Sequence, residues 1–507
     1  MRKNLFLPLL LPLLIISPAL YAADPISVAN QTRQWRMEHE QSIIDEFASL
    51  LSIPNVASDT VNIQKNAKHI SALLTPRGFK VRLLETQGSP PAVYAERTQA
   101  GASKTLMIYV HYDGQPVNAD DWASDPWIPV LRTGLVELGG QQVPMESPFD
   151  PEWRIFSRSA GDDKAPIIAL ISALDALDQA GIELSVNLKL FFEGEEEAGS
   201  PHLKQMLSAH RELLGADLWL FCDGPVHQSR RWLLSYGVRG SFGFGLTVFG
   251  PNRPLHSGHY GNWAPNPIMR LTDLIGSMRD SQGNILIKGY QQQVIPPTLL
   301  ELAAVEAAPS VDETLIRELG INRPETGQRV ELAVMRPAMN LRGIRSGDVG
   351  SQARNSIQTS ATASIGLRLV PAQTPDYLRE TIETHIRGQG YLIVYQDPTE
   401  EQRNAHDRIA LLDWSEAGYP AYRTPLNLPI AQSVAAIMNA LGDEALIQLP
   451  TMGGSLPLYL IDEVIGAPIL ILPIANHDNN QHGKDENLRL QNLWDAIEIY
   501  AAVLTSL

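Results

Sequence analysis

The chain has 507 residues, of which 44% are hydrophobic and 19% charged, the composition of an ordinary globular protein with room for two or three domains. Its 56 acidic and 40 basic side chains give a formal net charge of −16, and no basic block occurs, which argues against a nucleic-acid partner. Cys222 is the only cysteine, which excludes an intrachain disulfide and leaves stability to the core and to any bound metal.

The N-terminal segment has the pattern of a secretory signal peptide. A basic start at residues 1–3 is followed by an apolar run over 5–20 and by small residues up to Ala22 and Ala23. We therefore expect residues 1–22 to be removed after Ala22, and the mature protein to be periplasmic or secreted. The apolar run is short for a membrane span, so an uncleaved anchor is the minor alternative, and no later segment resembles a transmembrane helix.

Hydrophobic periodicity outlines a first domain that alternates strands and helices. It predicts helices over 32–51, 63–74 and 165–180, and strands over 79–84, 92–95, 105–110, 186–192, 217–221 and 467–473. Several of these strands are near-continuous apolar runs, which is typical of parallel strands covered on both faces. This pattern predicts an α/β fold with a mostly parallel sheet.

The middle of the chain has a different texture. Residues 241–249 alternate apolar and polar side chains as an antiparallel strand does, and a helix over 267–278 and a further strand over 360–370 come after them. We interpret residues 240–371 as an inserted α+β domain. The catalytic domain is then formed by residues 23–239 and 372–507.

Ionisable side chains come directly after four of the predicted apolar strands. They are His111, the run Glu193, Glu195, Glu196 and Glu197, then Asp223, and finally His477 and His482. Asp162 adds a carboxylate just before the helix predicted over 165–180. Because open α/β sheets bind ligands at the carboxyl ends of their strands, we expect these groups to form one site.

Dense carboxylates repel each other unless they face water or a cation. An acidic run alone is more often a solvated turn, but histidine nitrogen beside several carboxylates favours zinc, with manganese or cobalt as alternatives. An aspartate shared by two ions would make a two-metal site, and a further free carboxylate could then move protons. The sequence contains no His-Glu-x-x-His, no Gly-x-Ser-x-Gly and no phosphate-binding glycine loop.

At this point the motifs resemble a known family. They are His111-x-Asp113, Asp162-Asp163-Lys164, Glu193-Gly194-x-Glu196-Glu197-x-Gly199-Ser200, Asp223, Leu255-His256-Ser257-Gly258 and a late His482. In this order they resemble the carnosinase / aminoacylase / glutamate carboxypeptidase family of dinuclear zinc hydrolases over about residues 30–505, and most closely its carnosinase-like dipeptidases. The resemblance implies a zinc-peptidase catalytic domain in which the inserted domain serves as a lid and dimerisation domain.

The resemblance implies two zinc ions per chain bridged by Asp162. His111 and Asp223 would complete one ion's ligands, and Glu197 and His482 the other's. His477 is the alternative to His482, although residues 483–487 resemble the segment that succeeds the last histidine ligand in the family.

The same resemblance implies the catalytic groups. Glu196 would be general base and then general acid, and Asp113 would orient His111. His256, from the inserted domain, would polarise the substrate carbonyl across a dimer interface.

A third set of residues would hold the substrate's carboxylate. The resemblance gives this role to Arg368, with Gly454 and Ser455 in the loop beside it, and a guanidinium suits it because it can donate two parallel hydrogen bonds. One departure from the family pattern is Ala165, where a glycine is usual, and it removes no ligand.

We therefore expect a metallopeptidase that cleaves short peptides as a dipeptidase or carboxypeptidase. The runner-up is an N-acyl amino acid amidohydrolase of the aminoacylase type, and a non-catalytic zinc-binding protein is the alternative from another class. The expected substrate is a short peptide or an N-acyl amino acid. The expected assembly is a homodimer through the inserted domain, with no membrane span once the signal peptide is removed.

Overall fold

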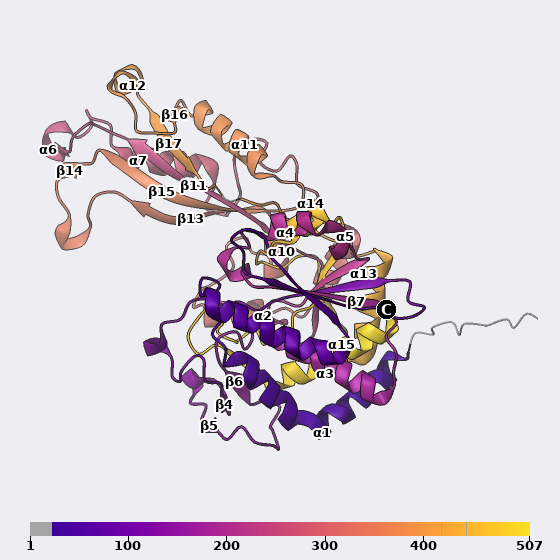
Figure 1. Ribbon diagram of the computed structural model, residues 1–507. Coiled ribbons are helices and arrows are strands. Elements are labelled where there is room, and N and C mark those ends of the chain that lie inside the picture. Colours follow the sequence, from indigo (N-terminus) through magenta and orange to yellow (C-terminus); the bar gives the residue numbers. More distant parts are fainter. Residues whose placement is uncertain (1–22, 417, 443) are drawn as a thin grey trace, which may run out of the picture.

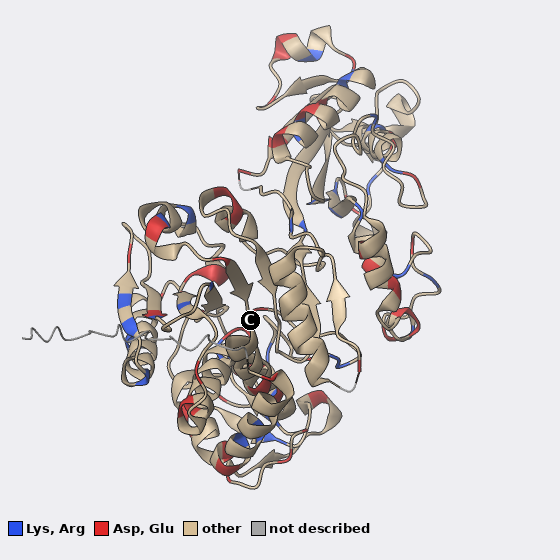
Figure 2. Ribbon diagram, turned by 90° about the vertical axis from the view of Figure 1, so that its right-hand side faces the viewer, with Lys and Arg blue, Asp and Glu red and all other residues tan. Residues whose placement is uncertain are grey.

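The computed structural model describes residues 23–416, 418–442 and 444–507, so the expected signal peptide lies outside the described residues. Two bodies are visible in Figure 1, a larger domain that holds both ends of the described chain and a smaller one above it. Acidic and basic residues are interspersed over both bodies (Figure 2).

An eight-stranded sheet forms the centre of the larger domain. Its strands are β1 (Lys80–Leu84), β2 (Ala92–Arg97), β3 (Thr105–His111), β7 (Asn187–Glu193), β8 (Leu218–Phe221), β9 (Leu233–Ser235), β19 (Ile447–Leu449) and β20 (Ile469–Ile471). They lie in the order β1-β2-β7-β3-β8-β20-β9-β19, and the central run from β7 to β20 is parallel. The expected α/β fold with a mostly parallel sheet is confirmed.

Helices cover both faces of this sheet. One face carries α1 (Pro25–Leu51), α2 (Thr60–Leu74), α3 (Ala165–Ala180), α13 (Pro429–Leu441) and α15 (Leu490–Ser506), and the other carries α4 (Leu203–Ala209), α5 (Arg211–Leu214) and α14 (Leu458–Val464). Along β3, Leu106, Ile108 and Val110 join the first core while Met107 and Tyr109 join the second. This double burial explains why the strand reads as a continuous apolar run.

A second, smaller sheet packs beside the first. It consists of β4 (Val130–Arg132), β5 (Gln142–Val143), β6 (Arg154–Phe156) and β21 (Asn487–Arg489), in the order β21-β6-β4-β5. Two short antiparallel pairs join β10 (Gly237–Val238) to β18 (Tyr422–Arg423) and β12 (Leu255–His256) to β14 (Ser356–Ile357). Short 3₁₀ turns are formed by Thr75–Arg77, Ala119–Asp121, Val136–Leu138, Glu196–Ala198 and Gly350–Gln352.

The smaller domain is a five-stranded sheet with helices on one face. Its elements are β11 (Gly240–Phe249), β13 (Ala338–Arg345), β15 (Ser360–Leu369), β16 (Leu392–Val394), β17 (Ile409–Trp414), α6 (Ser257–Tyr260), α7 (Pro267–Met278), α11 (Pro375–Gly388) and α12 (Glu400–Ala405). The strand order is β13-β15-β11-β17-β16, and α7 and α11 pack their apolar faces on it. The alternating burial of β15 matches the expected antiparallel strand.

The chain enters the second domain at β11 and leaves it later than residue 371. Because β17 pairs with β11 and β16 pairs with β17, the second domain extends to Trp414. The insertion also contains a helical segment that lies outside the five-stranded sheet. We call it the excursion, and it carries α8 (Leu299–Ala307), α9 (Asp312–Glu318) and α10 (Val330–Val334). Helix α8 packs on the first domain, where Glu301 forms an ion pair with Arg423 at 2.9 Å.

Candidate metal centre

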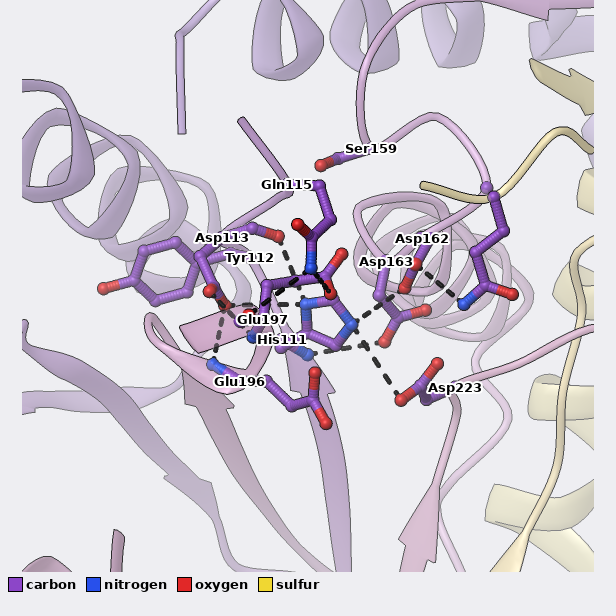
Figure 3. Close-up of polar contacts among 12 residues, drawn as sticks. His111, Tyr112, Asp113, Gln115, Ser159, Asp162, Asp163, Glu196, Glu197 and Asp223 are labelled. Atoms are coloured by element: carbon purple, nitrogen blue, oxygen red, sulfur yellow. Dashed lines mark hydrogen bonds and ion pairs between the residues drawn. The ribbon is translucent and has the colours of Figure 1, made fainter. Parts of the chain in front are cut away.

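Several of the predicted side chains meet at the carboxyl edge of the larger sheet (Figure 3). His111 is the last residue of β3, and Asp223 lies two residues beyond the end of β8. Strand β7 ends at Glu193 and leads into the 3₁₀ turn that carries Glu196 and Glu197. The parallel register of β7, β3 and β8 places these ends side by side.

Three buried residues form a first group of possible metal ligands. His111 Nε2 lies 2.9 Å from Asp162 Oδ1 and 3.9 Å from Asp223 Oδ2. The ligand atoms of this group all lie within 4.8 Å of one another. One imidazole nitrogen and two carboxylates are donors that suit zinc.

A second group shares Asp162 with the first. His482 Nε2 lies 3.2 Å from Asp162 Oδ2 and 3.1 Å from Glu197 Oε2. The two oxygens of Asp162 thus face different groups, the arrangement that a bridging carboxylate needs. The structure places His482 here, whereas His477 lines a neighbouring cavity.

The electrostatics of this cluster also fit a cation. Burial disfavours a charged imidazole, yet hydrogen bonds with Asp113 and Asp162 raise the pKa of His111 well above its ordinary value. Hydrogen bonds with Asp162 and Glu197 raise the pKa of His482 to about 10. Burial raises the pKa of Asp223 to about 7. The raised pKa values mean that His111, His482 and Asp223 hold protons, and these protons reduce the repulsion between the neighbouring carboxylates. A divalent cation bound here would reduce the repulsion in the same way.

Glu196 lies beside both groups but belongs to neither. Burial, followed by the charges of carboxylates including Asp223, raises its pKa well above the ordinary range of a glutamate. A carboxylate whose proton affinity is raised in this way, next to possible metal ligands, is suited to accept and return a proton.

Asp113 has a larger role than the one expected. Its carboxylate accepts hydrogen bonds from the backbone N–H groups of Glu196 and Glu197, both at 3.0 Å. His111 Nδ1 lies 3.2 Å from the Asp113 carbonyl oxygen and 3.5 Å from its carboxylate. Asp113 therefore fixes the turn that carries Glu196 and Glu197 as well as the ring of His111.

A buried ion pair that the sequence did not reveal holds Asp162 in place. Glu486 Oε1 accepts hydrogen bonds from the backbone N–H groups of Gly161 and Asp162, at 3.1 and 3.0 Å. Its other oxygen pairs with Arg158 at 2.5 Å, and Arg158 also donates to the carbonyl of Gly483, next to His482. The pair thus ties together two of the three segments that supply the second group, those of Asp162 and His482.

Two glutamine side chains also contact possible ligands. Gln481 Nε2 donates to Asp162 Oδ2 at 2.7 Å, and Gln115 Nε2 donates to Glu197 Oε2 at 2.9 Å. Gln481 directly precedes His482 and Gln115 lies two residues after Asp113, but no motif marked either glutamine.

A cavity of about 530 Å³ opens over the cluster, large enough for a small peptide. Asp162, Glu196, Glu197, Asp223 and His482 line it together with Gly454 and Ser455. Arg368 Nη1 donates to Ser455 Oγ at 2.8 Å, so this guanidinium reaches the loop from the second domain. The three residues expected to hold a carboxylate are therefore adjacent.

His256 is not near this cavity. It is exposed on β12, directly before α6, which Figure 1 shows at the end of the second domain far from the first. Its Nδ1 accepts a hydrogen bond from the backbone N–H of Gly258. Within one chain, His256 cannot contact a substrate at the metal centre.

Known proteins are similar to this chain in sequence. The family model of peptidase family M20/M25/M40 matches residues 107–506. The Cys-Gly metallodipeptidase of Schizosaccharomyces pombe is 25% identical over 91% of this chain and 96% of its own, and the human Beta-Ala-His dipeptidase is 23% identical over 82% of this chain and 76% of its own.

Solved structures agree on the fold. An M20 family metallo-carboxypeptidase from Sulfolobus solfataricus superposes with a TM-score of 0.72, covering 92% of this chain and 98% of its own at 23% identity. Human carnosine dipeptidase 1 superposes with a TM-score of 0.65 over 94% of this chain and 99% of its own at 19% identity.

The comparisons correct one prediction, that of a periplasmic or secreted location. The Cys-Gly metallodipeptidases of Schizosaccharomyces pombe and Saccharomyces cerevisiae, which match 91% and 90% of this chain, are intracellular enzymes. The expectation rested on residues 1–22, which lie outside the part that the structure describes.

Among the described residues, no helix combines the length and the apolar character needed to cross a membrane. The site holds histidine and carboxylate groups suited to a metal, and the matching relatives are metallodipeptidases. The chain belongs to peptidase family M20/M25/M40 and is a metal-dependent hydrolase of peptide bonds.

Proposed function

We propose that the chain is a dipeptidase with two zinc ions, held by the two groups that share Asp162. The observation that carries this proposal is the position of Asp162, whose oxygens face His111 on one side and His482 on the other. Asp223 and Glu197 would complete the two sets, and Mn²⁺ or Co²⁺ would fit the same donors. When bound, such ions polarise a substrate carbonyl and lower the pKa of a nearby water.

Glu196 would move the protons of the reaction. It lines the cavity and is free of the two ligand groups, so it can accept a proton from the attacking water and return it to the leaving amine. Asp113 acts through Glu196, because its carboxylate fixes the turn from which Glu196 projects.

Arg368, Gly454 and Ser455 would bind the free carboxylate of the substrate. The contact between Arg368 and Ser455 supports this role, because Ser455 lines the cavity and its hydroxyl accepts a hydrogen bond from the guanidinium. A carboxylate fixed there would align the adjacent amide bond with the metal centre, and this favours short peptides.

The names of the relatives support a dipeptide substrate, since they are Cys-Gly and Beta-Ala-His dipeptidases. N-acyl amino acids carry the same amide and carboxylate, so an amidohydrolase of the aminoacylase type is the second candidate.

A panel of dipeptides and matched N-acetyl amino acids separates the two candidates. We expect dipeptides to be cleaved by zinc-loaded protein and not after chelation, whereas cleavage of the acetyl compounds alone would establish the amidohydrolase. Glu196→Gln should retain zinc and lose about 10²–10⁴-fold in kcat. A fully active Glu196→Gln variant would remove the role proposed for this residue.

We further propose a homodimer in which His256 of each chain serves the metal centre of the other. The exposed position of His256, remote from its own chain's cavity, supports this arrangement. Glu196→Gln and His256→Ala should each be inactive alone. Mixing them should restore activity, because a mixed dimer contains one centre with an intact Glu196 and a His256 from its partner. No recovery on mixing, in subunits shown to exchange, would contradict the proposal.

A further inference from the structure

A second cavity, of about 340 Å³, lies between the sheet of the second domain and the excursion that carries α9 and α10. Its wall is mainly apolar with guanidinium groups among the apolar side chains. We call it the arginine cavity, and it is lined by residues that include Arg239, Arg336, Leu315, Ile316, Ile321 and Val334.

Arg239 is a buried cation without an acidic partner. Only 9% of its surface is exposed, its Nη2 donates to the carbonyl of Arg336 at 2.9 Å, and its Nε has no hydrogen-bond partner. No carboxylate of the described residues lies within ion-pair distance of it. Burial, and then the charge of Arg368, lower the pKa of Arg239 to about 10. Buried charges in proteins are normally paired, but this guanidinium has no counter-ion among the described residues.

The acidic residues on the wall of the arginine cavity do not supply that counter-ion. Asp312 accepts hydrogen bonds from the backbone N–H of Val330 and from the hydroxyl of Ser310, both at 2.9 Å. Glu325 is paired with Arg279. Arg336 also has no carboxylate partner among the described residues.

We propose that the arginine cavity binds a carboxylate carried on an apolar body, with Arg239 as its anchor. A guanidinium suits a carboxylate because its N–H groups form a planar fork, and the apolar wall formed by Leu315, Ile316 and Val334 would bury the rest of the ligand.

The arginine cavity is separate from the substrate cavity. The backbone N–H of Arg239 donates to the carbonyl of Gly454 at 3.2 Å, and Ser455 Oγ donates to the carbonyl of Arg239 at 2.8 Å. The main chain at Arg239 and the loop at residues 454–455 therefore form a wall between the two cavities. The proposal does not depend on the peptidase mechanism, and its ligand should not compete with a dipeptide.

The test uses hexanoate as the probe and hexan-1-ol as its uncharged match. Each is titrated calorimetrically into the full-length zinc-loaded Glu196→Gln protein, with a dipeptide present to occupy the metal centre. We expect hexanoate to bind at least about tenfold more tightly than hexan-1-ol, because a charge-assisted hydrogen bond contributes that much. Arg239→Met should abolish this preference.

A second variant keeps the test decisive if Arg239→Met does not fold. Leu315→Trp fills the arginine cavity from α9 and should abolish binding of both probes, whereas Leu138→Trp, at an exposed position of the first domain, should bind as the parent does. A parallel titration without the dipeptide should give the same affinity for hexanoate. Equal affinity for hexanoate and hexan-1-ol, unchanged binding in Leu315→Trp, or hexanoate binding that occurs only without the dipeptide would each overturn the proposal.

Discussion

The two domains contribute to the site in different ways. The first domain gathers its groups at one edge of one sheet, where the parallel register of β7, β3 and β8 decides which side chains meet. The second domain places its two candidates at opposite ends of β11 and β15. Arg368 lies near the point where the chain passes from the first domain into β11, since Gly240, the first residue of β11, pairs with Leu369. His256 lies beyond the other end of β11. The ten residues of β11 correspond to roughly 30 Å.

This difference separates what one chain can build from what needs a second one. Side chains on neighbouring parallel strands meet whenever the sheet forms. A side chain from the second domain reaches the centre only if it lies near the point where the chain passes between the domains, as Arg368 does, or if another chain presents it. We therefore expect changes of the ligand groups in the first domain to weaken metal binding, and a change of Arg368 in the second domain to weaken substrate binding.

The largest effect should come from Asp162→Asn, which removes the carboxylate shared by both groups. An amide cannot hold two cations as a carboxylate does, so we expect the loss of at least one zinc and a fall in turnover of about 10³-fold or more. Metal content by atomic spectroscopy and kcat on a dipeptide check this result. Two tightly held zinc ions in this variant would show that Asp162 is not the bridge.

A smaller effect is expected from Arg368→Met in the second domain. Loss of a charge-assisted hydrogen bond to the substrate's carboxylate should lower kcat/KM by about 10²-fold, mainly through KM, with zinc content unchanged. A dipeptide amide, which lacks that carboxylate, provides the control. If the amide loses as much as the free dipeptide does, Arg368 does not bind the carboxylate.

Sequence patterns predicted the parts of the site that a single sheet determines. His111 and Asp223 come at the ends of apolar runs, and Asp162 lies just before helix α3, so strand and helix ends were enough to bring them together. The choice between His477 and His482 could not be derived in this way, because both lie in an irregular loop after β20 and only the fold shows that His482 turns toward Asp162.

Other features depend on contacts that no local pattern records. The pair of Arg158 and Glu486 joins residues 328 positions apart, and nothing near either residue marks the partner. The end of the inserted domain was placed at 371 instead of Trp414 because β16, α12 and β17 form a parallel strand–helix–strand unit. The first domain is built from the same pattern, so hydrophobic periodicity could not show that this unit belongs to the second domain.

A third prediction tests the buried pair itself. Glu486→Gln keeps the shape of the side chain but weakens its hold on Arg158 and on the backbone of Asp162. We expect zinc affinity to fall about 10–100-fold, as is usual when a group that orients metal ligands is changed. Competition with a coloured chelator measures it. Glu152→Gln makes the same chemical change at a carboxylate that is 56% exposed, and it should leave the affinity unaltered.

The smallest effect concerns the contact between the excursion and the first domain. Glu331 on α10 pairs with Arg329 at 2.7 Å and lies 3.8 Å from His227 Nε2. Burial opposes its charge, but the contacts with His227 and Arg329 outweigh it and lower the pKa of Glu331 to about 2. Since the folded pKa is below the unfolded value, the charged Glu331 stabilises the fold above about pH 4.5, and this contribution is lost as the pH falls towards 2.

Glu331→Gln should therefore lower the free energy of unfolding by about 1–2 kcal/mol at pH 6 and by less at pH 3.5, measured by urea unfolding of the zinc-free protein. Glu313→Gln, an exposed change on α9, should show no such pH dependence. A Glu331→Gln deficit that stays constant with pH would mean that the charge of Glu331 does not stabilise the fold.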